Sequence, residues 1–138
     1  YELNKRNIMK KINVAAILSS VLVFSSHAYA ESMPLTHQNI QGTWALEYTK
    51  KSEKSEERRL REDNWTFNGN GTVTIKHIPR EGSYYDQLPV NYEIVDDKLK
   101  IAILGRSGKF DSFSLVNKDE SNMILKARFG SIYQFKKK

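Results

Sequence analysis

Gly42-Thr43-Trp44-Ala45-Leu46-Glu47-Tyr48-Thr49 is the stretch that decides the fold class of this chain. Its large apolar residues, Trp44, Leu46 and Tyr48, alternate with smaller or polar ones. Because successive side chains of a β-strand point to opposite faces, this two-residue repeat predicts a strand with one buried face.

The same repeat recurs further along the chain. It is found in residues 65–67, 73–77, 90–94, 99–103, 113–115, 123–127 and 133–135. About eight short strands in roughly a hundred residues is the spacing typical of an all-β sandwich or barrel. The repeat therefore predicts an all-β domain.

Short polar connectors separate most of these strands. Asn68-Gly69-Asn70-Gly71 supplies residues that tolerate positive φ, which is typical of a tight hairpin turn. Similar turns are predicted at Asp96-Asp97 and at residues 105–108, 117–122 and 130–131. Parallel neighbours would need long crossovers, so the chain is predicted to form an antiparallel meander. Closure into a barrel would leave no unpaired edge, but a two-sheet sandwich fits the alternation equally well.

Two connections are longer. Residues 50–63 are almost wholly charged, which is compatible with a short exposed helix or with an extended hairpin arm. Residues 79–89 are bracketed by prolines and carry two adjacent tyrosines, so they are predicted to form a loop.

The segment Ile40-Gln41-Gly42-Thr43-Trp44 resembles the Gly-x-Trp signature of lipocalins. Later segments resemble the small bacterial lipocalin-like domains: 65–67, 70–73, 92–94 with 97–99, and 123–125 before 133–135. The resemblance implies a small antiparallel barrel of about eight strands. It also implies that Gly42 and Trp44 lie at the closed end of that barrel beneath a cavity, with the Trp44 ring covered by a basic residue of a late strand. We expect that residue to be Arg128.

The N-terminal region has the order of properties found in a secretory signal. Lys10-Lys11 is followed by an apolar run within 14–24 and by Ala28-Tyr29-Ala30, an A-x-A cleavage site. We therefore predict a signal peptide and preceding extension over 1–30, a flexible lead-in over 31–39 and one barrel domain over 40–138. The apolar run is interrupted and short for a bilayer span, so an exported, periplasmic or secreted protein without a stable membrane anchor is expected.

Composition excludes several classes of function. The formal net charge is +6, but three units of it fall in residues 1–30 and most of the rest in Lys136-Lys137-Lys138, so no nucleic-acid partner is expected. The chain has no cysteine, which excludes a cysteine nucleophile and thiolate metal sites. His37 and His77 lie too far apart in sequence for a metal signature, and no catalytic or cofactor motif is found. We predict a monomeric protein that binds rather than catalyses, without metal or cofactor.

The candidate ligand-binding residues are aromatic residues and one histidine: Trp65, Phe67, His77, Tyr84 and Tyr85. If the barrel is open, they could line its mouth and contact a small apolar or aromatic ligand. Alternatively, Trp65 and Phe67 are plain core, His77 reaches solvent, and the two tyrosines belong to a protein interface. The second hypothesis is therefore a protein-binding factor of the envelope, such as an inhibitor, an immunity protein or an assembly accessory, which contacts its partner through residues 50–61 and Tyr84-Tyr85.

Overall fold

The protein is described from a computed structural model in which residues 33–138 are placed. The predicted signal peptide lies outside the described residues. Residues Met33–Lys138 form one compact unit.

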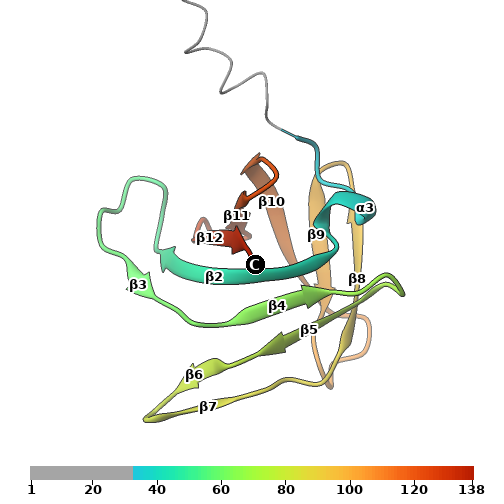
Figure 1. Ribbon diagram of the computed structural model, residues 1–138, viewed down its shortest axis with the longest axis horizontal. Coiled ribbons are helices and arrows are strands. Elements are labelled where there is room, and N and C mark those ends of the chain that lie inside the picture. Colours follow the sequence, from blue (N-terminus) through green and yellow to red (C-terminus); the bar gives the residue numbers. More distant parts are fainter. Residues whose placement is uncertain (1–32) are drawn as a thin grey trace, which may run out of the picture. The chain divides into compact units, whose positions relative to one another are not determined.

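Eight antiparallel strands close into a barrel (Figure 1). They are β2 (Gly42–Lys50), β4 (Asn64–Phe67), β5 (Thr72–Lys76), β8 (Val90–Val95), β9 (Lys98–Ala102), β10 (Phe110–Lys118), β11 (Asn122–Ala127) and β12 (Ile132–Lys137). The ring closes because β12 pairs with β2, with Phe135 opposite Leu46. The predicted lipocalin-like barrel is confirmed, and the sandwich alternative is excluded.

The two longer connections contain additional strands. Within residues 50–63, β3 (Arg59–Leu60) pairs with the end of β2, so this region is a hairpin arm and not a helix. Within 79–89 the prediction of a loop is wrong, because β6 (Ile78–Arg80) and β7 (Ser83–Tyr85) form a separate two-stranded hairpin. Gly82 makes its turn with a φ of +75°. Pro79 fits there because this hairpin has only edge strands.

The residues just before β2 pack against the barrel. Thr36 caps a single-turn helix, α3 (His37–Ile40), through a capping box with Asn39. Leu35 is 3% exposed and belongs to the hydrophobic core. The described part of the predicted lead-in, residues 33–39, therefore packs against the barrel, ahead of the boundary predicted at Ile40.

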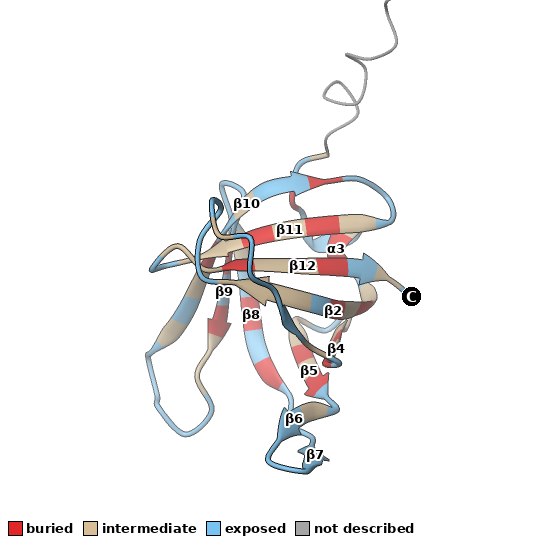
Figure 2. Ribbon diagram, turned by 90° about the vertical axis from the view of Figure 1, so that its left-hand side faces the viewer, coloured by how far each residue is buried: buried red, intermediate tan, exposed pale blue. Residues whose placement is uncertain are grey.

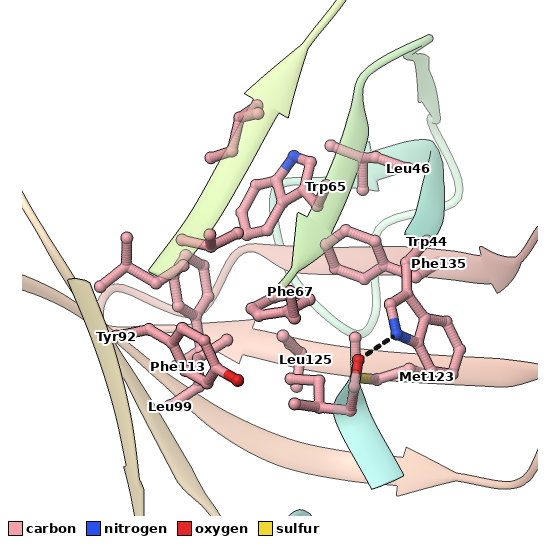
Figure 3. Close-up of a cluster of buried hydrophobic side chains, with 14 of the residues drawn as sticks. Trp44, Leu46, Trp65, Phe67, Tyr92, Leu99, Phe113, Met123, Leu125 and Phe135 are labelled. Atoms are coloured by element: carbon pink, nitrogen blue, oxygen red, sulfur yellow. Dashed lines mark hydrogen bonds between the residues drawn. The ribbon is translucent and has the colours of Figure 1, made fainter. Parts of the chain in front are cut away.

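The core lies inside the barrel, and buried residues alternate with less buried ones along most of the barrel strands (Figure 2). Among its fully buried members are large side chains from most of the strands: Trp44, Leu46, Phe67, Leu99, Met123, Leu125 and Phe135 (Figure 3). Strands form where apolar residues recur at every second position, because this repeat lets a strand bury all of its apolar side chains on one face.

The barrel has two different ends. Because α3 precedes β2, it lies at the same end as the turns β4–β5, β8–β9 and β10–β11; we call this the closed end. The arm between β2 and β3, the β6–β7 hairpin and the turns β9–β10 and β11–β12 lie at the other end, which we call the open end. Figure 1 shows α3 and the β2–β3 arm at opposite ends of β2.

Candidate functional site

The closed end is filled and its polar groups are satisfied. Trp44 is fully buried, and its indole N–H donates to the Ile40 carbonyl at 2.8 Å. The ammonium groups of Lys118 and Lys137 lie 4.9 and 4.7 Å from the centre of the Trp44 ring. Gly42, with a φ of +110°, lets Lys137 approach, because a Cβ at Gly42 would lie 2.8 Å from Lys137 Nζ.

The expected role of Arg128 requires a correction. Its guanidinium lies 5.9 Å from the ring of Phe129, in the β11–β12 turn at the open end, and not over Trp44. Lys137 covers Trp44 because the register of β12 on β2 places these two residues opposite each other. The two-residue repeat of β12 could have indicated that Lys137 faces the core, since Phe135 and Lys137 share a face of the strand.

Lys118 is a buried cation at the closed end. It is 2% exposed, and its ammonium donates to the Asp119 carbonyl at 3.2 Å. Burial lowers the pKa of Lys118, and the charge of Lys137 lowers it further, while Asp119 and Glu120 oppose the shift. The sequence repeat did not indicate this residue.

Trp65 is the corresponding tryptophan nearer the open end. It is 6% exposed, and its Nε1 is the one buried side-chain nitrogen or oxygen among residues 33–138 that has no hydrogen-bond partner. In Figure 3 this nitrogen points away from Phe67, which follows Trp65 along β4 toward the closed end. The indole N–H is therefore directed toward the open end.

Asp63 and Arg61 form a charged pair just above Trp65. Asp63 is 3% exposed, and Arg61 donates to its two carboxylate oxygens at 2.9 and 2.8 Å. This bidentate geometry neutralises a carboxylate that would be costly to bury alone. Neither residue was predicted to lie near a ligand site, and Arg61 was named only within the docking segment 50–61, although both continue the inward repeat of Trp65 and Phe67.

Tyr133 joins the core to the open end. Its ring packs edge-on against Phe113 at 5.2 Å and Trp65 at 6.1 Å between centroids. Burial raises the pKa of Tyr133; Arg61 opposes that shift, and Asp111 and Asp63 add to it. The phenol therefore remains a hydrogen-bond donor at neutral pH.

Tyr133 lines two clefts at the open end. The first has a volume of about 630 Å³ and an aromatic wall of Phe110, Phe113, Phe129 and Tyr133. Four basic residues, Lys100, Arg106, Lys109 and Arg128, and one acidic residue, Asp111, also line it. The second cleft, of about 600 Å³, has five basic residues, Lys50, Lys51, Arg58, Arg59 and Arg61, against one acidic residue, Glu57. Both clefts therefore have an excess of basic residues; the first has an aromatic wall of four residues, and Tyr133 is the one aromatic residue that lines the second.

The structure separates the predicted ligand-binding residues into two groups. Trp65 and Phe67 are buried in the core and do not line either of these clefts. His77, Tyr84 and Tyr85 lie in or beside the β6–β7 hairpin and are all exposed. The five residues therefore do not form one site.

The exposed group forms an ordered cluster. His77 stacks on Tyr84 at 3.8 Å, and both contact Glu62, which accepts a hydrogen bond from the Tyr84 hydroxyl at 3.1 Å. This hydrogen bond and the charge of Glu62 raise the pKa of Tyr84. His77 has a φ of +59°, which ends the inward repeat of β5 and turns the ring to solvent.

Two solved structures are similar to this one. A lipocalin-like protein from Bacteroides uniformis superposes with a TM-score of 0.56 and 15% sequence identity, over 72% of this chain and 99% of the other. An uncharacterized protein from Bacteroides eggerthii gives a TM-score of 0.57 and 17% identity, over 71% of this chain and 98% of the other. No protein-family model and no curated protein matches the sequence. The domain is thus a lipocalin-like β-barrel in its fold.

Two further findings concern residues 33–138 alone. None of their helices is long and apolar enough to cross a membrane. Among these same residues, no three His, Asp or Glu side chains are grouped so that they could hold a metal ion.

Proposed function

We propose that this protein is an exported binding protein that holds a small ligand with an apolar or aromatic body in the clefts at the open end. The aromatic wall of Phe113 and Tyr133 carries this proposal, because it borders open volume while the closed end is packed. Ligand sites are concave, mostly apolar and bear a few polar groups. The ligand therefore lies above Trp65, and not beside Trp44.

A neutral fluorescent probe, N-phenyl-1-naphthylamine, tests the binding. We expect its fluorescence to rise on titration with the protein, with a dissociation constant on the order of micromolar. Ala127→Phe fills part of the first cleft and should weaken binding about tenfold, which corresponds to about 1.4 kcal/mol. Val95→Phe, at an exposed position of β8, is the matched control and should leave binding unchanged. Absence of probe binding would overturn the proposal.

Export is the second part of the proposal, and the predicted signal over 1–30 supports it. N-terminal sequencing of the protein recovered from the periplasm or medium should give Glu31 as the first residue. A recovered chain that retains residues 1–30 would contradict export by cleavage.

An envelope protein partner is the alternative function. Tyr84 and Tyr85 favour it, because they are exposed large side chains held in fixed positions, Tyr84 by Glu62 and Tyr85 beneath Arg80 at 4.3 Å. Tyrosines of this kind are enriched in protein interfaces. A pull-down from the native host should lose a partner when Tyr84 and Tyr85 are both changed to Ser; an unchanged partner list contradicts this alternative.

A further inference from the structure

We propose that the second cleft binds an oxyanion, such as a carboxylate, sulfonate or phosphate, carried by the ligand of the open end. This inference rests on the proposed function, because the anionic group belongs to the ligand whose apolar body lies against Tyr133. It adds the chemical class of that ligand.

The positive charge of the second cleft is only partly neutralised within the protein. Arg61 is paired with Asp63, and Arg58 stacks on Tyr48 at 4.3 Å. Among the described residues, Arg59 and Lys51 form no ion pair, and both line the cleft. Arg59 lies opposite Thr49 in the β2–β3 pairing, so their side chains share a face of the sheet. Lys50, the fifth basic residue, donates to the Glu53 carbonyl at 3.2 Å. The cleft therefore has two cations without a partner among the described residues, and one acidic residue, Glu57.

Two hydrogen-bond donors in or behind the wall beside these cations have no acceptor. Trp65 does not line the cleft, but its ring packs against Tyr133, and its N–H is buried and has no partner. Within residues 33–138 the hydroxyl of Tyr133 also donates to no acceptor, and this residue lines the cleft. The nearby buried acceptor, Asp63, uses both oxygens for Arg61.

This excess of donors favours one class of ligand group. An oxyanion only accepts hydrogen bonds, and it forms short, charge-assisted bonds with guanidinium groups. The five basic residues would repel a cationic ligand, and a neutral group would not neutralise their charge.

A matched pair of probes tests the inference. 1-Anilinonaphthalene-8-sulfonate has the same aromatic body as N-phenyl-1-naphthylamine and adds one sulfonate. We expect the sulfonate probe to bind about tenfold more tightly at low ionic strength. The difference should shrink as salt is added, because exposed charges are screened.

Variants locate the anion. Arg59→Gln should weaken the sulfonate probe about tenfold and leave the neutral probe unchanged, while Tyr133→Phe should weaken it severalfold. Lys98→Gln removes the same charge from an exposed position at the closed end and is the matched control. If Lys98→Gln weakens the binding of the sulfonate probe as much as Arg59→Gln does, the effect is one of net charge and the local site is overturned.

The outcomes separate the inference from the proposed function. Equal affinity for both probes overturns the oxyanion site and leaves the proposed function intact. Failure of both probes to bind overturns the two together. Displacement of the sulfonate probe by dodecanoate supports a carboxylate ligand, and displacement by dodecyl phosphate alone supports a phosphate ester; displacement by dodecanol as effective as by either overturns the inference.

Discussion

The two tryptophans of this barrel lie in opposite environments, although both are buried. Trp44, at the closed end, donates to the Ile40 carbonyl and lies under two ammonium groups. Trp65, nearer the open end, has an N–H without a partner and follows the charged pair of Arg61 and Asp63 in the chain. Since buried polar groups are nearly always paired, the difference marks the closed end as structural and the open end as the region with unused bonding capacity.

The largest expected effect comes from the same substitution at both tryptophans. Trp44→Phe leaves the Ile40 carbonyl without its donor, whereas Trp65→Phe removes an N–H that was already unpaired. Both variants lose apolar contact. The Trp44 variant should therefore lose about 1–3 kcal/mol more of its free energy of unfolding than the Trp65 variant.

Urea unfolding followed by circular dichroism measures both variants under the same conditions. Each variant is the control for the other, because the change in side-chain volume is the same. Equal losses, or a larger loss for Trp65→Phe, would show that the two ends do not differ in the way described.

The fold was predictable because it depends on a local signal. Each strand buries one face, so the two-residue repeat of Leu99 and Ile101, or of Met123 and Leu125, is present in the sequence itself. Closure was not predictable from the repeat, since it depends on the pairing of β12 with β2, the last and the first strands of the barrel in the sequence. The resemblance to lipocalins supplied that step.

Gly42→Ala tests the closed end with a smaller expected effect. The alanine would hold an unfavourable φ and its Cβ would meet Lys137 Nζ, so a loss of about 1–2 kcal/mol is expected in urea unfolding. Gly71→Ala is the matched control, because Gly71 also has a positive φ, +86°, but nothing lies within 4 Å of its added Cβ. If Gly71→Ala costs as much, the close approach of Lys137 contributes nothing.

The open-end site was only partly predictable. Trp65 was selected as an aromatic residue, but its unpaired N–H depends on what surrounds it in three dimensions. Arg61 and Asp63 are hidden in a charged segment whose other members are solvated, so composition alone did not separate them. Tyr133 becomes important only through the pairing that brings β12 beside β2 and places its ring against Trp65.

Tyr133→Phe is expected to have the smallest effect on stability, and the effect should depend on pH. Near pH 7 the phenol is protonated in both the folded and the unfolded chain, so the variant should differ from the wild type by less than about 0.5 kcal/mol. Burial raises the pKa of Tyr133 in the folded protein above that of the unfolded chain, which is about 10. The stabilisation associated with this shift is thus fully present below pH 10.

Above that pH the unfolded chain releases the proton more readily than the folded one. The free energy of unfolding of the wild type should therefore fall as the pH rises through the folded pKa, and that of Tyr133→Phe should fall less steeply. Urea unfolding between pH 8 and about pH 11 measures both slopes. Parallel slopes would mean that the hydroxyl is as solvated in the folded chain as in the unfolded one, and Tyr133 would then not be a desolvated donor at the boundary between the packed core and the open end.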